Sequence, residues 1–100
     1  MTYRTRIDLL VARQMRSWGL TDYLWVETHL RLNERLPQSP TAVLRRDPSL
    51  FGDEGMVYGF VLIDPGNRLR EHLCAYQVFY HADESTLLVA AGACFTRQGA

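Results

Sequence analysis

The residues best suited to chemistry lie in the last third of the chain. His81 is a histidine, the residue type that most often serves as a general acid or base. Glu71 and its neighbour His72 could share that role. Arg70 and Arg97 carry permanent, planar positive charges that match the oxygens of a phosphate group. These residue types would suit proton transfer beside a bound phosphate.

Each of these candidates also has an ordinary structural explanation. His81 can be a surface histidine at the end of a strand, and Glu71 can form an ion pair with Arg68 or Arg70. Arg97 follows the last apolar run, where a chain end can fray. Residue types alone leave both explanations open.

The candidates lie on or beside two apolar runs that predict an antiparallel hairpin. Residues 69–81 and 86–95 are rich in strand-forming residues, and the polar segment between them predicts a turn at Asp83 and Glu84. In that register Cys74 and Cys94 are expected on opposite faces, so no bridge between them is expected. Strand alternation then gives one apolar face that needs a core, made of Tyr76, Val78, Tyr80, Leu87, Val89 and Ala91.

The opposite face of the hairpin is apolar around a polar centre. It carries Leu73, Phe79 and Leu88 beside Gln77 and His81. Such a face can be a second core or a shallow working surface. If it is open, we expect its three apolar side chains to receive a helix of a partner protein.

The first half of the chain predicts a strand and a helical hairpin. Alternation over residues 3–7 predicts a short strand whose wet side carries Arg4 and Arg6, which could extend a phosphate track or block aggregation at a sheet edge. Helical spacing predicts helices over residues 9–18 and 21–36, joined at Gly19. The expected apolar half of the second helix contains Tyr23, Trp25, Val26, His29, Leu30, Leu32 and Leu36.

The middle of the chain predicts a connection and one more strand. Residues 37–55 hold three of the four prolines and predict a loop with one short helix, capped by Ser39. Residues 56–63 are dense in strand formers, and residues 64–67 predict a turn. The fold class is therefore α+β, with the element order β-α-α-β-β-β in a single domain over residues 1–100 and the helical hairpin on one face of an antiparallel sheet.

The composition is that of an ordinary globular domain. It is 47% hydrophobic and 22% charged, with zero formal net charge. No apolar run approaches the ~20 residues that a membrane-spanning helix needs, and the first residues do not form a signal peptide. We therefore expect a soluble, cytoplasmic protein. The histidines and cysteines have no zinc-like spacing, so neither a metal nor a cofactor is expected.

The C-terminal hairpin carries a recognisable sequence pattern. Residues 69–71 read Leu-Arg-Glu, residues 76–80 read Tyr-Gln-Val-Phe-Tyr, and an acidic turn and an apolar strand follow. This pattern, with the order of elements, resembles the RelE/ParE toxin superfamily, in which the region commonly reads Arg-Glu-Leu, a spacer, Tyr-Arg-Val-x-Tyr, an acidic turn and a Val-rich strand. The resemblance implies a small domain whose helical hairpin packs on one face of a curved antiparallel sheet.

The same resemblance implies a function. It suggests a toxin-like component of a type II toxin–antitoxin system, neutralised by an antitoxin protein. RelE-type members cleave mRNA at the ribosome, so the chain would be a metal-independent endoribonuclease in which His81 or Glu71 transfers protons and Arg70 and Arg97 hold the phosphate. The residues expected to contact RNA are Arg4, Arg6 and Gln77. Two alternatives remain open: a ParE-like inhibitor that binds DNA gyrase without catalysis, and a diverged, non-toxic protein-interaction domain.

Two positions depart from the family pattern. Gln77 stands where the family usually has Arg, and residues 93–95 stand where a His-Arg pair often ends the last strand. A neutral Gln can donate a hydrogen bond but brings no charge. Losing one charge-assisted contact at a transition state costs about 3 kcal/mol, or about 100-fold in rate. An endoribonuclease built on this chain would need its cations from other positions.

Overall fold

The computed structural model describes residues 3–81 and 85–98, and within them the sheet has four strands. These strands are β1 (Arg4–Ile7), β2 (Met56–Asp64), β3 (Asn67–His81) and β4 (Thr86–Gln98), in the order β1-β4-β3-β2. The three C-terminal strands are antiparallel neighbours, as expected. β1 runs parallel to β4, so the sheet is mixed and not wholly antiparallel. The predicted turn residues Asp83 and Glu84 lie outside the described residues.

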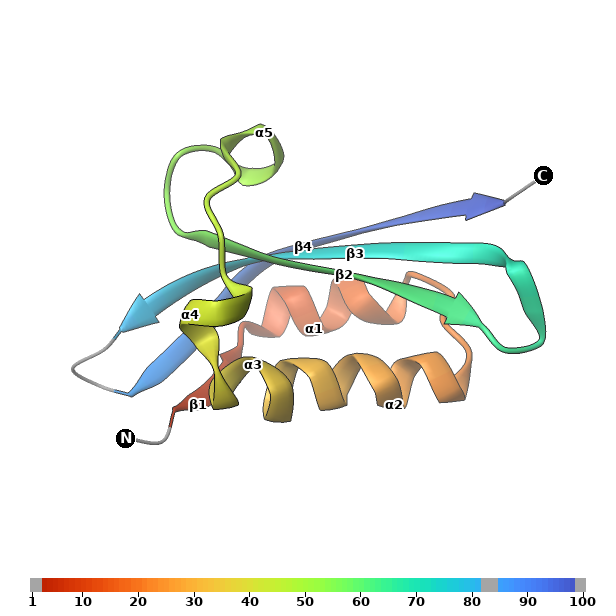
Figure 1. Ribbon diagram of the computed structural model, residues 1–100, viewed down its shortest axis with the longest axis horizontal. Coiled ribbons are helices and arrows are strands. Elements are labelled where there is room, and N and C mark those ends of the chain that lie inside the picture. The colour runs from red at the N-terminus through yellow and green to blue at the C-terminus, as the bar shows by residue number, and fades with distance from the viewer. Residues whose placement is uncertain (1–2, 82–84, 99–100) are drawn as a thin grey trace.

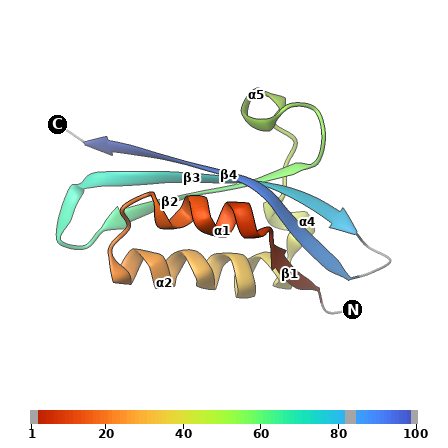
Figure 2. The ribbon, with the colours of Figure 1, turned by 180° about the vertical axis from the view of Figure 1, so that it is seen from behind.

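Two helical rods cover one face of the sheet (Figures 1 and 2). The first is α1 (Leu9–Arg16), which begins where the Asp8 side chain accepts a hydrogen bond from the Leu10 amide at 2.9 Å. The second joins α2 (Asp22–Leu30), the π turn η1 (Arg31–Arg35) and α3 (Leu36–Gln38). Gly19, with φ of 70°, allows the reversal between the rods. The expected α+β class, with a helical hairpin on one face of the sheet, is confirmed.

The buried stripe of the second rod differs from the predicted one. Its buried side chains recur at every fourth residue, whereas Tyr23, Val26 and Leu30 are exposed. An α-helix advances about 40° beyond a full turn in four residues, so such a stripe would drift around the rod. The wider π turn reduces this drift and keeps the later members over the sheet. The buried stripe consists of Leu24, Thr28, Leu32 and Leu36.

The connection to β2 contains two short helices, where one was expected. α4 (Pro40–Val43) follows Ser39 as predicted, although the Ser39 side chain makes no capping hydrogen bond. α5 (Pro48–Phe51), like α4, starts at a proline that follows a residue of a capping type, here Asp47. The Asp47 side chain accepts a hydrogen bond from the Ser49 amide at 3.3 Å. Figure 1 shows α5 on the face of the sheet opposite the helical rods, which we call the outer face.

A β-bulge changes the register of the C-terminal hairpin. Val78 pairs with Val89, as predicted, but Gln77 pairs with Ala91, so Ala90 is the extra residue. The bulge brings Gly92 opposite Tyr76. A Cβ atom on Gly92 would lie 3.1 Å from the Tyr76 ring, so the bulge sets a residue without a side chain against a large aromatic.

The bulge overturns the prediction for the two cysteines. Cys74 pairs directly with Cys94, and both side chains lie on the helix-facing side of the sheet. Their sulfur atoms are 4.0 Å apart and both cysteines are free. The predicted opposite faces followed from an unbroken alternation, which the extra residue interrupts.

The core lies between the sheet and the helical rods. Tyr76, Val78, Leu87 and Val89 are fully buried there, as predicted. Tyr80 was predicted to join them but is 38% exposed, because it sits near the end of β3, where its hydroxyl bonds that of Tyr3 at 2.6 Å. No helix among the described residues has the length and apolar character to cross a membrane.

Candidate functional site

The four predicted catalytic residues lie at two opposite ends of β3. Arg70, Glu71 and Arg97 lie at the end next to the β2–β3 turn, where Arg70 pairs with Gln98. His81 is the last residue of β3. At about 3.3 Å per residue, His81 is roughly 33 Å from Glu71 along the strand. His81 cannot act on the same substrate atoms as the other three.

The three residues at the first end do not form one constellation either. Glu71 pairs directly with Arg97, whose guanidinium donates a hydrogen bond to the Glu71 carboxylate. The charges of this pair offset each other at an exposed position. Strand alternation places Arg70 on the other face of the sheet, with His72. The set therefore divides into an ion pair on the outer face and a separate arginine on the helix-facing side.

His72, considered with Glu71 for proton transfer, is a buried structural residue. Its side chain is 2% exposed and its Nδ1 atom lies 3.0 Å from the Thr96 hydroxyl. Burial lowers the pKa of His72, and the nearby charge of Arg70 lowers this pKa further, against a smaller opposing effect of Asp64. His72 is therefore held in its neutral form between β3 and β4.

Gln77, the predicted RNA contact, is engaged within the chain. Its amide nitrogen donates to the carbonyl oxygens of Glu54, at 2.9 Å, and Phe51, at 3.5 Å. These bonds fasten the segment after α5 to the outer face. Gly55 sits so close that a Cβ there would lie 3.4 Å from the Phe79 ring. Gln77 thus positions a loop, and its amide is engaged within the chain.

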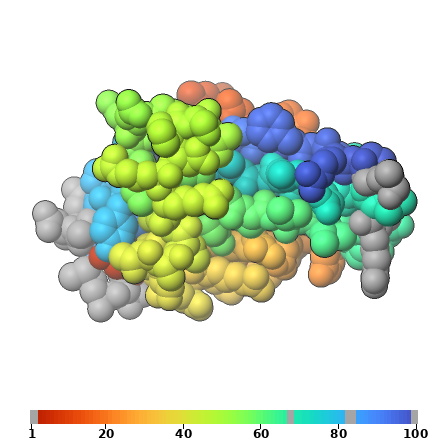
Figure 3. Space-filling view, turned by 45° about the horizontal axis from the view of Figure 1, so that its top comes forward, coloured from red at the N-terminus to blue at the C-terminus, as the bar shows by residue number. Residues whose placement is uncertain are grey.

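The three predicted partner contacts lie on the outer face, as the alternation implies. Phe79 is half-buried below the loop that Gln77 holds, and Leu88 is half-buried on the neighbouring strand. Leu73 borders a pocket of about 340 Å³ on the part of the outer face that the loop leaves open. Figure 3 shows the loop covering one end of this face, and β2, β3 and β4 reaching the surface at the other.

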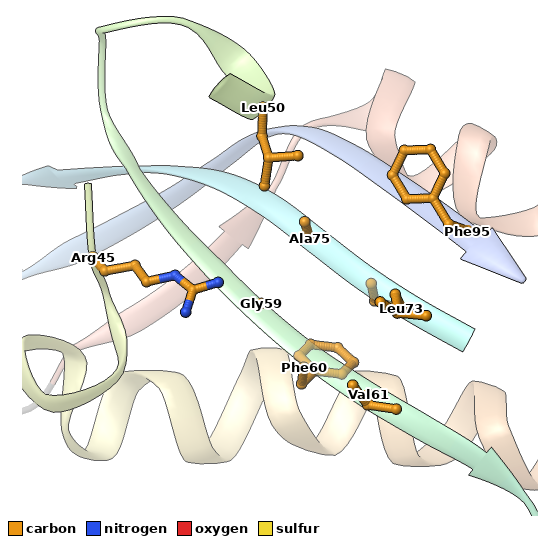
Figure 4. Close-up of a pocket in the computed structure, with 9 residues that line it drawn as sticks. Arg45, Leu50, Gly59, Phe60, Val61, Leu73, Ala75 and Phe95 are labelled. Carbon is orange, nitrogen blue, oxygen red and sulfur yellow. The ribbon is translucent and has the colours of Figure 1, made fainter. Parts of the chain in front are cut away.

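The pocket combines an apolar floor with one arginine (Figure 4). Leu50 of α5, Val61 of β2, Leu73 of β3 and Phe95 of β4 surround it, and Arg45 extends into it from the connection. Val61 is 46% exposed and Phe95 is 59% exposed, which is unusual for large apolar side chains. The arrangement suits an apolar ligand surface that carries a negative charge at one end.

Arg4 and Arg6 lie on β1, at the edge of the sheet opposite to β2 and away from this pocket. Both are exposed on β1, where they border a hollow with Thr5 and Thr86. The order β1-β4-β3-β2 separates them from Arg45 by the width of the sheet. The other predicted RNA contact, Gln77, lies on β3, with β4 between it and β1, and its amide bonds the loop after α5.

Sequence reasoning missed a group of arginines around β2. The Arg31 guanidinium lies over the Phe60 ring, 5.0 Å from its centroid. Arg31 and Arg35 both contact the Glu27 carboxylate, at 3.2 and 3.7 Å. Burial raises the pKa of Tyr58, and these two arginines oppose that effect, which places their charges beside β2.

Arg45 completes this group from the opposite side of β2. One of its terminal nitrogens would lie 3.6 Å from a Cβ on Gly59. The available sequence signal was a glycine inside a strand, which often marks a close approach by another group. The loop predicted over residues 37–55 did not indicate this contact.

Comparisons with known proteins add no family assignment. No protein-family model, no curated protein and no solved structure matches this chain. Within the described residues, no group of three or more His, Cys, Asp or Glu side chains converges on a position that could hold a metal ion.

Proposed function

We propose that the chain is a toxin-like component of a type II toxin–antitoxin system that acts in the cytoplasm by binding a protein target, in the manner of ParE, and not by cutting RNA. The helical hairpin on one face of a sheet with three sequential antiparallel strands agrees with the architecture of that superfamily. DNA gyrase is the target that the ParE-like reading implies.

The distance between the predicted catalytic residues is the main reason to propose binding and not cleavage. Attack of a hydroxyl group on a phosphate needs its acid, its base and its cations within hydrogen-bond reach of one reacting group. His81 lies roughly 33 Å along β3 from Glu71, and Glu71 is already paired with Arg97. Gln77 holds a loop. A toxin that inhibits by binding needs none of these groups to meet.

The surface properties of the chain agree with a protein target. The formal net charge is zero, whereas domains that hold ribosomal RNA are normally strongly basic. The outer face exposes Val61 and Phe95 beside a pocket, which is the kind of surface that protein partners bury. The proposal therefore places the activity on this face.

Induced expression in a bacterial host tests the proposal. We expect growth arrest with intact mRNA and with loss of negative supercoiling in a reporter plasmid. His81→Ala and Arg70→Ala should leave the arrest unchanged, since His81 lies at the end of β3 far from the pocket and Arg70 lies on the helix-facing side of the sheet. Phe95→Ala should weaken it, whereas Leu10→Ala, which removes an equally exposed apolar side chain from α1, should not.

Other outcomes would decide against the proposal. Cleavage of mRNA that disappears in His81→Ala or Arg70→Ala would establish the RelE-type endoribonuclease instead. Expression without any arrest, from a chain that folds, would leave a non-toxic interaction domain. Arrest with intact mRNA and normal supercoiling would reject gyrase as the target while retaining a binding mechanism.

A further inference from the structure

The edge of β2 that faces away from β3 is only partly paired. At its beginning, Val57 exchanges two backbone hydrogen bonds with Arg45, at 2.7 and 3.1 Å. Because backbone groups alternate along a strand, those of Gly59, Val61 and Ile63 point to the same side as those of Val57. Among the described residues, no other backbone bond is made on this edge. An unpaired edge of this kind is a template for another strand.

Sequence does not protect this edge. Between Met56 and Ile63, β2 has neither a charged residue nor a proline, which are the usual features that block strand addition. The side chains of Val61 and Ile63 are 46% and 53% exposed on the outer face. An added strand would lay every second side chain beside them and toward the pocket at Leu73.

The charges around the edge are mostly positive. Arg31 and Arg35 lie on the helix-facing side of β2, and Arg45 lies against Gly59 on the other. One carboxylate, that of Glu27, is shared by Arg31 and Arg35. The side chain of Arg35 is 58% exposed. If another strand pairs with this edge, those of its side chains that point toward the helices will therefore lie near an excess of positive charge.

We propose that the free edge of β2 binds an extended segment of a partner protein in which apolar and acidic side chains alternate. The segment continues the sheet, its apolar side chains cover Val61 and Ile63, and its acidic side chains meet Arg31 and Arg35. Edge binding does not depend on toxicity. If the proposed function holds, the segment belongs to the antitoxin, and a binding measurement with purified protein separates the two proposals.

Two other occupants fit the same edge less well. A second copy of β2 would supply no acidic side chain between Met56 and Ile63. The Arg31 and Arg35 side chains of the two copies would then lie near one another without opposite charges from the added strand. RNA would match the arginines but would leave the row of backbone groups and the exposed Val61 without suitable partners. An alternating peptide satisfies all three features at once.

The test uses a fluorescent synthetic peptide of about nine residues in which Val and Glu alternate. We expect saturable binding by fluorescence anisotropy, and weakening by salt because exposed charges take part. Amide hydrogen exchange by NMR should slow about tenfold at Gly59, Val61 and Ile63. It should stay unchanged at Phe60 and Leu62, whose amides point toward β3. A peptide with Lys in place of Glu should not bind.

Matched variants locate the binding. Arg31→Gln with Arg35→Gln should weaken binding about tenfold, while Arg13→Gln with Arg16→Gln, two exposed changes on α1, should not. Val61→Pro removes an outward amide and should weaken binding about tenfold more than Val61→Thr, which changes the side chain but keeps the amide. If Val61→Pro does not fold, a peptide N-methylated on the residues that face β2 makes the same test with the unchanged chain.

Several results would overturn the inference. They are absence of binding below about 1 mM peptide, equal binding of the Lys peptide, and binding without slower exchange at Gly59, Val61 and Ile63. A dimer of the free chain that Val61→Pro disrupts would assign the edge to a second copy. An oligonucleotide that displaces the peptide while protecting the same amides would assign it to RNA.

Discussion

Cys74 and Cys94 face each other across β3 and β4, with their sulfur atoms 4.0 Å apart on the helix-facing side of the sheet. One extra residue, Ala90, produces this arrangement, because it reverses the alternation of every residue after it in β4. The same residue brings Gly92 below the Tyr76 ring. The bulge thus determines both the packing of the central tyrosine and the position of the second cysteine.

The two thiols should react slowly in the folded chain. Burial raises the pKa of both Cys74 and Cys94, and the thiolate is the form that alkylates. We expect iodoacetamide at about pH 7.5 to modify them at least tenfold more slowly than in the urea-unfolded chain, with Cys94 reacting before the 2% exposed Cys74. Mass spectrometry follows the reaction, and Ser49→Cys provides an exposed control thiol. Equal rates in folded and unfolded chains would contradict the prediction.

The stability of the chain should fall in mild acid because of His72. Since burial lowers the pKa of His72, the unfolded chain binds a proton before the folded chain does. Relative to neutral pH, stability therefore starts to fall below about pH 6.5, the unfolded value, and the loss is complete only below the folded value. We expect urea unfolding between about pH 7 and pH 5 to show this decrease.

Two variants identify the histidine responsible for this pH dependence. His72→Gln should flatten it. Burial also lowers the pKa of His29, but that side chain is only half-buried, so His29→Gln should retain most of the dependence. An unchanged slope in His72→Gln would show that another group dominates.

Tyr76→Phe should leave the chain at least as stable as it is now. The Tyr76 hydroxyl is buried and makes no hydrogen bond among the described residues. Its removal relieves the cost of taking a polar group out of water, so the free energy of unfolding should stay the same or rise by about 1 kcal/mol. Tyr58→Phe is the matched control, and it should lose about 1 kcal/mol because the Tyr58 hydroxyl interacts with Arg31. A loss of more than about 1 kcal/mol in Tyr76→Phe would count against this account.

Gln77→Ala should free the loop that follows α5. The variant loses the two bonds from the Gln77 amide to the carbonyl oxygens of Phe51 and Glu54. We expect a loss of about 1 kcal/mol and faster amide exchange in residues 52–55. Gln77→Glu should behave similarly, since a carboxylate cannot donate these bonds. Gln98→Ala, at the exposed end of β4, should have neither effect. Unchanged exchange in Gln77→Ala would mean that other contacts hold the loop.

Much of the fold could be predicted because local patterns determine it. The two helices of the hairpin and the three C-terminal strands agree with the sequence signals. The bulge could not be predicted, because residues 90–93 are three alanines and a glycine that fit either face of a strand. The buried stripe of the second rod was predicted at Leu32 and Leu36 but not at Leu24 and Thr28, for a related reason: helical wheels assume 3.6 residues per turn, whereas this rod contains a π turn.

The candidate site was harder to predict than the fold. The sequence indicated which residue types can transfer protons, but residues on one strand share a site only when they lie a few positions apart. The length of β3 separates His81 from Glu71. The group of Arg31, Arg35 and Arg45 comes from a helix and a loop that meet only at β2, so no sequence spacing indicates it.

The parallel pairing of β1 with β4 has a consequence for how the chain is made. Ribosomes deliver the N-terminal end first, yet Arg4–Ile7 finds its neighbour only when Thr86–Gln98 has been synthesised. The apolar sides of the helical rods therefore stay exposed until the strands that cover them have been synthesised. Folding of this domain therefore cannot finish until Thr86–Gln98 has emerged from the ribosome. Before then, a chaperone or a co-translated partner can engage the uncovered rods.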